Sequence, residues 1–298
     1  MIAHMSMSIA SEGGLVPIPH PQPVRDQTVF QYTNAQGLIG IIGGHKLWAS
    51  STLALNDLSE VKYGIEVVTE AAAGRGGRAS VTLQRMLERE DFAGVTRESY
   101  VVSASSDGDS ISQWVAYAGA LGYAIEFDTH HDLDRVDGFR PEDARVVTLP
   151  VTDSLAYGAA WWYHIVYERE EQLKIVRAIL DVLDEHGFSM DTHLFVPISL
   201  CITTFKHKSF ANEREVRFIA RTNPQARDHF RPGRYGIIPY AEIVSTEPEE
   251  KRLPIRSVVI GPLNQDERPY AEATVRSLLD ANGYPEVSVG FSSAPYRY

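Results

Sequence analysis

The chain has 298 residues, of which 44% are hydrophobic and 10% aromatic, and its formal net charge at pH 7 is −11. This composition is that of a globular protein able to bury a sizeable core, as one large domain or two small ones. The negative charge argues against broad, non-specific binding to nucleic acid or to an anionic membrane, although it is compatible with a local basic site.

Cysteine content and hydropathy indicate the cellular location expected for the chain. The one cysteine, Cys201, excludes an internal disulfide, so a cytoplasmic location is the simplest interpretation. Its neighbours in "PISLCITTF" are apolar, which predicts a buried, inert thiol. No stretch approaches the roughly 20 apolar residues of a membrane span, so we expect no membrane association.

The N-terminal segment differs in composition from the rest. Residues 1–27 are rich in Ser, Gly and Pro and lack the basic segment and apolar run of a signal peptide. We therefore expect a disordered leader over 1–27. Residues 28–298 show no internal repeat and no linker, which predicts a single domain.

The first half of this domain begins with a strand over 28–34 and a short helix that ends at Gly43-Gly44, a pair suited to a helix C-cap. The pattern then predicts a strand at 46–51, a helix at 56–74 that is capped by Asn56 or Asp57, and a second helix at 81–91. A strand at 99–106, a helix at 111–120 and a strand at 123–128 follow.

The second half mixes strands and helices without strict alternation. Strands are predicted at 144–151, 161–168, 213–221, 235–244, 255–263 and 287–293, and helices at 169–186 and 267–283. The apolar run 193–205 suits a buried strand or a buried helix equally well. The predicted fold class is α+β, with a mixed, mainly antiparallel sheet and peripheral helices.

Common catalytic signatures are absent: the sequence contains no GxxxxGK[ST], HExxH, CxxC or GxSxG. His130 and His131 lie among aspartates, but a solvated turn after the strand 123–128 explains them better than a metal site. We therefore predict no metal ligands.

The segment "KSFANEREVRFIA" (208–220) carries two glutamates within a predicted strand. Because side chains alternate along a strand, Glu213, Glu215 and Arg217 face one way, and Val216 and Phe218 mark the opposite face as the core side. The acidic face could be a salt-bridged surface of an exposed sheet. It could also be a paired-carboxylate site in which Arg217 holds one carboxylate ionised.

Hydroxyls and aromatic rings end several earlier strands. Tyr32 and Thr33 close the first strand, Trp48 and Ser50 the second, and Ser103 lies in the strand 99–106. If these strands share a sheet with the glutamates, the rings and hydroxyls could line one cleft with them.

Taken in order, several spaced motifs resemble a bacterial family of unknown function, numbered 2971. They are the Tyr32-Thr33 pair, "KLWASS" followed by "ND" and Glu60, "VVSAS", "QWVAY", "NEREVRF", "LPIRSVVIGP" and "SSAPYR", and they span about residues 29–298. Because this family has no assigned activity, the resemblance bears on the fold more than on the function.

A second similarity is to the ADP-ribosyltransferase-like fold. Tyr-Thr on a first strand, a short helix and a second strand ending in an aromatic residue and serine are similar to its first elements, and "NEREVRF" could supply its catalytic glutamate. The chain departs from that pattern because it has "QYT", with no histidine, on the first strand. The intervening elements are also longer.

This similarity implies that NAD is the substrate and that ADP-ribose is transferred to a nucleic-acid or protein acceptor, as in a toxin or a phage-defence effector. Glu215 would then stabilise the positive charge that develops on the ribose, and Glu213 would orient or deprotonate the acceptor. The other expected contacts are Trp48 or Tyr32 to nicotinamide, Thr33 and Ser50 to the ribose, Ser103 in the same cleft, and Arg217 or Arg297 to the diphosphate.

Two other classes of function fit the same residues. Asp57, Glu60, Glu213 and Glu215 with Lys208 could form a metal-dependent nuclease site. The charged strand could also be the interaction face of a non-enzymatic binding or regulatory module. The acceptor and the oligomeric state do not follow from the sequence.

Overall fold

The fold was analysed in a computed structural model of the whole chain. The residues that the structure describes are 8–11, 14–24, 27–52, 58–88, 99–118, 121–136, 160–188, 190–221, 229–233, 236–247 and 251–295.

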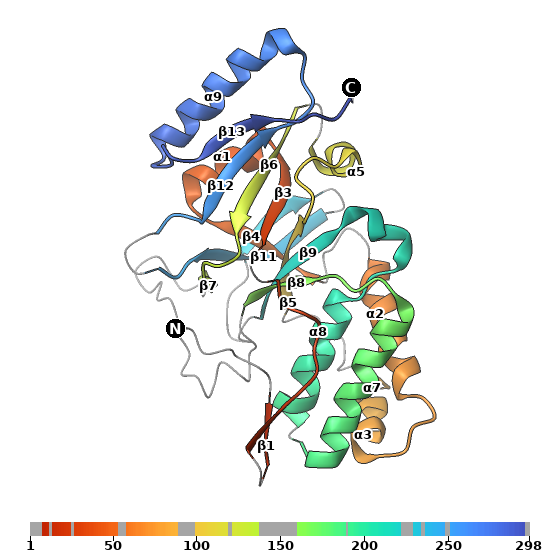
Figure 1. The fold of residues 1–298 in the computed structure, drawn as a ribbon. Coiled ribbons are helices and arrows are strands. Elements are labelled where there is room, and N and C mark those ends of the chain that lie inside the picture. The colour runs from red at the N-terminus through yellow and green to blue at the C-terminus, as the bar shows by residue number, and fades with distance from the viewer. Residues whose placement is uncertain are drawn as a thin grey trace.

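One large sheet organises the described residues (Figure 1). Its main path runs β10-β11-β4-β5-β3-β6-β12-β13, with β9 paired to β5, β8 to β9 and β7 to β11. All pairs are antiparallel except β12 with β13, which confirms the predicted α+β class with a mixed, mainly antiparallel sheet. The strands are β3 (Thr28–Asn34), β4 (Leu47–Ser51), β5 (Ser99–Ser105), β6 (Gly122–Asp128), β7 (Leu133–Val136), β8 (Trp161–His164), β9 (Glu215–Arg221), β10 (His229–Gly233), β11 (Gly236–Ser245), β12 (Ile255–Ile260) and β13 (Ser288–Phe291).

The sheet divides at β5. One edge of β5 pairs with β9 along all seven residues, from Ser99 to Ser105. The other edge is shared: β4 pairs with Tyr100 and Val101, and β3 pairs with Ser105. The strands β3 and β4 therefore pair with opposite ends of the same edge of β5. Ser103 lies on β5 between these two points of pairing.

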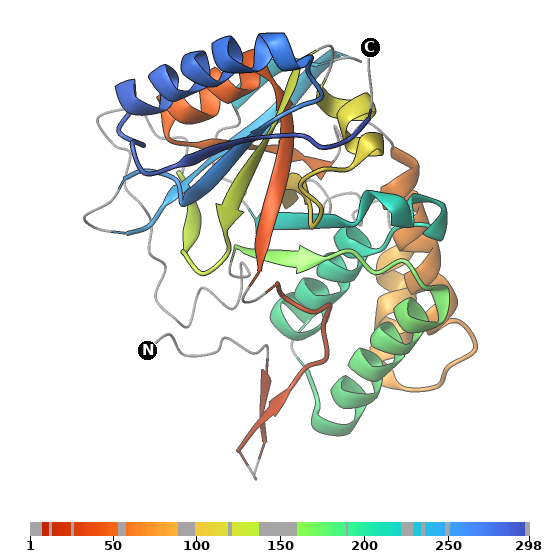
Figure 2. The same ribbon diagram turned by 45° about the horizontal axis from the view of Figure 1, so that its top comes forward.

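Helices cover both faces of the sheet (Figures 1 and 2). The helices α1 (Ala35–Gly44) and α9 (Arg268–Ala281) pack on one face and contribute Leu38, Ile42 and Leu279 to its core. A group of helices lies at the other end of the molecule, below the sheet in Figure 1. It consists of α2 (Leu58–Ala72), α3 (Arg78–Leu87), α7 (Arg169–His186) and α8 (Val196–Thr204).

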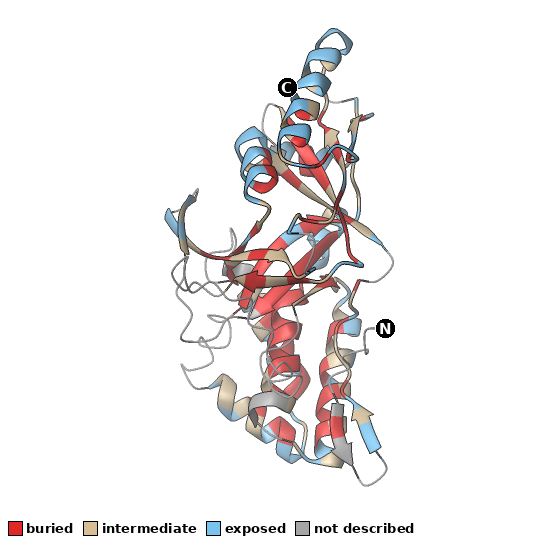
Figure 3. Ribbon diagram, turned by 90° about the vertical axis from the view of Figure 1, so that its left-hand side faces the viewer, coloured by how far each residue is buried: buried red, intermediate tan, exposed pale blue. Residues whose placement is uncertain are grey.

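The hydrophobic core follows this division, with buried residues along the strands and the inner sides of the helices (Figure 3). Val216 and Phe218 of β9 are fully buried in the main core, which confirms the core side predicted for this strand. On the opposite face, Ile219 packs with Val101 and with Leu200 of α8. The helical group has its own core, which includes Cys201, so the thiol is buried as predicted.

Two segments differ from the predictions, and the structure decides a third that the sequence left open. Ser8–Ser11 (β1) and Gly14–Pro17 (β2) form a two-stranded sheet inside the segment expected to be a disordered leader, and Ile9 is buried against the helical group. The ambiguous run 193–205 is largely the buried helix α8. Lys208–Glu213 forms a 3-10 helix (η4), so the strand begins only at Glu215. Three other predicted features, the strand 144–151, the Asn56-Asp57 cap and Arg297, lie outside the described residues.

One carboxylate holds Ser292 and Ser293, the first two residues of the "SSAPYR" motif. Asp109 accepts hydrogen bonds from the Ser293 backbone N–H at 2.8 Å and from the Ser293 hydroxyl at 2.7 Å. It also accepts one from the Trp114 indole at 2.9 Å and one from the Ser292 hydroxyl. Burial alone would raise the pKa of Asp109, but these bonds lower it. Asp109 therefore ties Ser292 and Ser293 to the segment that leads into α5 (Ile111–Gln113) and the adjoining π-helix η2 (Trp114–Ala118).

The close packing of α2 on α8 can be tested at Gly64. A Cβ atom at this position would lie 2.6 Å from the carbonyl oxygen of Ile202, which is buried backbone that cannot shift freely. Gly64→Ala should therefore destabilise the protein by about 1–3 kcal/mol in urea unfolding, because overpacking outweighs the gain in helix propensity.

Gly40 provides the matched control. It lies in α1 with nothing within 4 Å of an added Cβ, so Gly40→Ala should leave the protein equally stable or more stable by about 0.5 kcal/mol. Equal stability of the Gly64→Ala variant and the wild type would contradict this packing.

Candidate functional site

Five charged side chains meet where the helical group joins the sheet. Glu60 comes from α2, Lys206 follows α8, Glu213 ends η4, and Glu215 and Arg217 begin β9. We call this set the ion cluster.

Lys206 is the centre of the ion cluster. Its Nζ lies 2.6 Å from Glu213 Oε2, 2.9 Å from Glu215 Oε2 and 3.0 Å from Glu60 Oε1. The same ammonium lies 4.9 Å from the ring centroid of Phe210. One buried cation therefore contacts three carboxylates, from the helix α2, the 3-10 helix η4 and the strand β9.

Arg217 is the second cation. Its Nε donates to Glu215 Oε1 at 2.6 Å, and its Nη2 donates to Glu215 Oε2 at 3.0 Å and to Glu60. Its Nη1 donates to the carbonyl oxygen of Thr203, at the end of α8, at 2.9 Å. All three guanidinium nitrogens are thus used within the protein.

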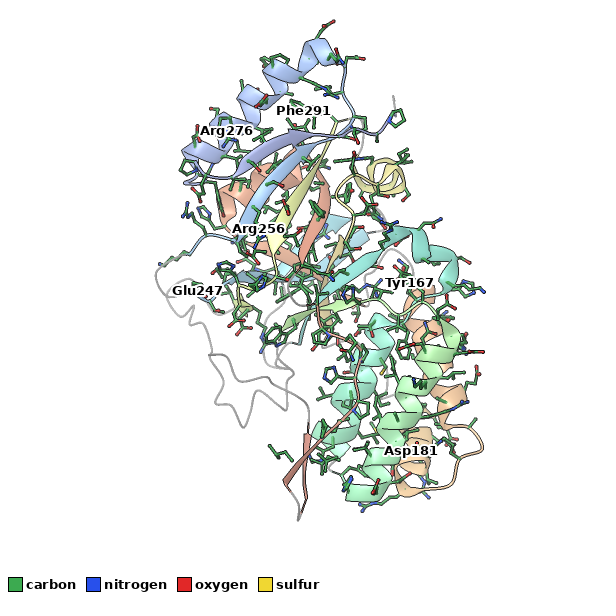
Figure 4. The ribbon with its side chains drawn as sticks, viewed as in Figure 1. Tyr167, Asp181, Glu247, Arg256, Arg276 and Phe291 are labelled. Carbon is green, nitrogen blue, oxygen red and sulfur yellow. The ribbon has the colours of Figure 1, made fainter. Side chains whose placement is uncertain are left out.

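The local backbone explains how both glutamates reach Lys206 although only one lies on the strand. Arg214, between them, adopts a left-handed conformation with φ of 45°, which turns the chain from η4 into β9. The Glu215 backbone N–H donates to the hydroxyl of Tyr167 at 2.8 Å. Tyr167 lies at the junction of the sheet and the helices in Figure 4. The two acids therefore meet through a turn rather than through the strand alternation that the sequence suggested.

Burial and pairing act in opposite directions on the cluster pKa values. Burial alone would raise the pKa of Glu215, but Arg217 and Lys206 overcome it and lower this pKa to about 2. Burial alone would lower the pKa of Lys206, but Glu215 and Glu60 raise it. Burial raises the pKa of Tyr117, and the negative charge of Glu213 adds to this effect. Glu215 and Lys206 are therefore both charged at neutral pH, because each of these buried groups has an opposite charge beside it.

The two glutamates differ in their access to solvent. The Glu215 side chain is only 6% exposed and both of its oxygens accept bonds, whereas the Glu213 side chain is 22% exposed. Tyr117 and Phe210, both exposed, belong to the two segments nearest this side of the cluster, η2 and η4. Glu213 is thus the carboxylate that a ligand can reach.

Part of the expected aromatic and hydroxyl lining shares a face with the cluster. Ser103 of β5 is opposite Arg217 of β9, and Ser50 of β4 is opposite Val101 of β5. Because side chains two apart in a strand share a face, Trp48, Ser50 and Ser103 lie on the same side of the sheet as Glu215. Trp48 is 45% exposed, and Ser103 is exposed as well.

Other predicted residues are placed differently. Tyr32 is buried: its hydroxyl donates to the Asp107 carbonyl oxygen at 2.8 Å, and its ring packs edge-on against Trp114. Thr33 alternates with Tyr32 and points to the other face of the sheet, against Gly37 of α1. Neither side chain is free to contact a ligand on the face that carries Trp48.

The sequence reasoning missed two kinds of residue at this site. The sequence places Glu60 only in the family motifs and among possible nuclease acids, and it assigns no ion pair to Lys206. No periodic pattern in the sequence predicts the hydrogen bond between Tyr167 and Glu215, which are 48 residues apart. A charged residue in an apolar setting, such as Lys206 after "ITTF", was the available signal.

The described part of the chain contains no group of three or more His, Cys, Asp or Glu side chains placed to hold a metal ion. Asp128, next to the two histidines, accepts two hydrogen bonds from Arg256 and one from the His130 backbone N–H, and it also contacts the His130 ring. None of the described helices combines the length and the apolar character that a membrane crossing requires.

Comparison with known proteins adds one finding. Residues 113–218 match the model of a family described as "Protein of unknown function (DUF2971)". This confirms the family resemblance over a segment that contains Lys206, Glu213, Glu215 and Arg217, while Glu60 lies outside it. No curated protein and no solved structure matches the chain, so the similarity to ADP-ribosyltransferases stays a prediction.

The ion cluster predicts a pH dependence of stability. The pKa of Glu215 lies below its ordinary value in the folded protein, so its contribution is present above that ordinary value and lost as the pH falls towards about 2. We expect the free energy of unfolding to decrease between about pH 5 and pH 2 in urea titrations. Glu215→Gln should lose about 3–5 kcal/mol at pH 7, because two buried cations lose a partner, and should show a smaller decrease with acid.

The control for this measurement is Glu70→Gln. Glu70 is 52% exposed and pairs with Arg169 on the surface, so its loss should cost less than about 1 kcal/mol. Equal losses for Glu215→Gln and Glu70→Gln would show that the ion cluster does not stabilise the fold.

Proposed function

We propose that the protein is an NAD-dependent transferase that cleaves the nicotinamide–ribose bond and passes ADP-ribose to a nucleic-acid or protein acceptor. One observation carries the proposal: Glu213, partly exposed, belongs to a cluster of buried ion pairs on a sheet face that also presents Trp48 and Ser103.

The charge of the cluster suits this reaction. Three carboxylates and two cations leave one net negative charge beside the candidate substrate position. When the bond from nicotinamide to ribose breaks, nicotinamide leaves as a neutral molecule and the ribose gains positive charge. A fixed carboxylate stabilises that charge without having to reorganise during the reaction.

The contacts divide the roles of the two glutamates. Glu213 would hydrogen-bond the ribose 2′-hydroxyl, because it has the more accessible carboxylate. Glu215 would act as a positioning residue, since Lys206 and Arg217 occupy its oxygens and Lys206 in turn orients Glu213. The proposal thus gives Glu213 the role at the ribose that the sequence suggested for Glu215.

The alternative of a metal-dependent nuclease has less support. A magnesium ion would have to displace Lys206 or Arg217 from the carboxylates that they already bind, at the cost of leaving a buried cation unpaired. A non-enzymatic binding module stays compatible with the same cluster and is an outcome of the test below.

The test measures nicotinamide release from NAD by liquid chromatography, with DNA, RNA or protein extract as acceptor. Glu213→Gln should lower kcat by about 100-fold or more with little change in KM, because it removes an interaction made mainly in the transition state. EDTA should leave the rate unchanged, whereas a magnesium-dependent nuclease would lose its activity.

Glu66→Gln is the matched control, since Glu66 is an exposed glutamate on α2, outside the ion cluster. Its activity should equal that of the wild type. If the folded wild type releases no nicotinamide with any acceptor and NAD causes no thermal shift, the transferase proposal fails and the binding module is favoured.

A further inference from the structure

A second group of side chains extends the same sheet face beyond Trp48. In the register of β4, β11 and β10, Ser50 is opposite Tyr240, and Tyr240 is opposite His229. Arg231 follows His229 by two residues and therefore shares its face. We call Trp48, Ser50, His229, Arg231 and Tyr240 the platform.

The platform contains three neighbouring rings. Trp48 lies 4.8 Å from Tyr240 between ring centroids, with 35° between the planes, and His229 lies 5.4 Å from Tyr240 at 31°. Tyr240 is 9% exposed, whereas Trp48 is 45% exposed. The Trp48 ring thus has exposed surface on which a planar ligand can stack, and the buried Tyr240 ring packs against Trp48 and holds it in place.

Arg231 differs from the other buried or half-buried arginines of the site. It is half-buried, and among the described residues no carboxylate lies within salt-bridge distance of it. Its Nη2 donates to Ser50 Oγ at 2.8 Å, while its buried Nε has no hydrogen-bond partner. Burial lowers the pKa of Arg231, and only Tyr240 opposes this effect. A cation withdrawn from water without an anion is costly, which makes this position receptive to an anionic ligand.

The opposite end of the platform is already neutralised. Lys46, two residues before Trp48, pairs with Glu242 at 2.6 Å. The free positive charge is therefore on the Arg231 side, and the exposed ring is on the Trp48 side. A ligand that satisfies both sides carries a planar ring at one end and an anion at the other, and the planar fork of an arginine matches a phosphate well.

From this arrangement we infer that the platform binds a nucleotide, with its heterocyclic base on Trp48 and a phosphate at Arg231. Ser50 links the two, because its hydroxyl contacts Arg231 and its side chain lies two residues from Trp48 on the same face.

This inference deepens the proposed function where it identifies the nucleotide as NAD. Arg217 was expected at the diphosphate, but Glu215, Glu60 and Thr203 occupy its donors. Arg231 takes that role instead. The face of β5 lies between the platform and the ion cluster, since Ser50 is opposite Val101 and Ser103 is opposite Arg217. One dinucleotide can thus run from phosphates at Arg231 to a ribose beside Glu213.

Isothermal titration calorimetry with AMP, ADP-ribose, adenosine and inorganic pyrophosphate tests the inference. AMP and ADP-ribose should bind the wild type at least tenfold more tightly than adenosine does. Arg231→Gln should remove this difference and leave adenosine binding unchanged, and Arg231→Lys should restore part of it. Trp48→Leu should weaken adenosine and AMP equally.

Arg85→Gln is the control, because Arg85 is an exposed arginine on α3, far from the platform in the fold. It should bind all four compounds like the wild type, and circular dichroism should show that every variant is folded. Equal AMP binding by Arg231→Gln and the wild type would overturn the inference, as would binding of pyrophosphate alone with no contribution from the base.

The outcomes separate this inference from the transferase proposal. Nucleotide binding that depends on Arg231, without any nicotinamide release, keeps the platform and rejects the reaction. Nicotinamide release that is insensitive to Arg231→Gln keeps the reaction and rejects the platform.

Discussion

The pairing of two buried cations with three glutamates is the interaction on which this structure depends. Lys206 and Arg217 are almost fully buried, and a charge in that position is tolerated only when an opposite charge and hydrogen bonds replace its water. Glu60 brings α2 to the cluster, and Thr203 brings the end of α8. The same contacts that neutralise the charges therefore fix the helical group against the sheet.

The division of the sheet at β5 gives this pairing its functional setting. Because β3 and β4 leave β5 at different ends of one edge, Ser103 stays exposed although its partner Arg217 is buried. The buried ion cluster thus lies beside an accessible part of the same sheet face. Sites built on strands hold their side chains more closely than sites on loops, which suits a reaction that depends on fixed charges.

The arginine of the platform and the arginine of the ion cluster differ in whether their hydrogen-bond donors have partners within the protein. This difference separates their proposed roles. Each guanidinium nitrogen of Arg217 donates to a partner inside the protein, so Arg217 supports other residues. Arg231 has a buried donor without a partner, so it is suited to a ligand. Glu213 and Glu215 also differ, because the Glu213 side chain is the more exposed of the two. Residue type alone does not distinguish one arginine or one glutamate from the other, whereas hydrogen bonding and exposure do.

The sequence by itself determined the fold class, the limits of most described strands and helices, and the core side of β9, because hydrophobic periodicity encodes which face of an element is buried. It also marked Glu213, Glu215 and Arg217 as a charged group and placed Trp48, Ser50 and Ser103 near the ends of strands. Only the tertiary structure decided that Tyr32 is buried, that the left-handed Arg214 turns Glu213 towards Lys206, and that Arg231 donates to Ser50. These facts depend on strand register and on contacts between residues far apart in the chain, which a local pattern does not contain.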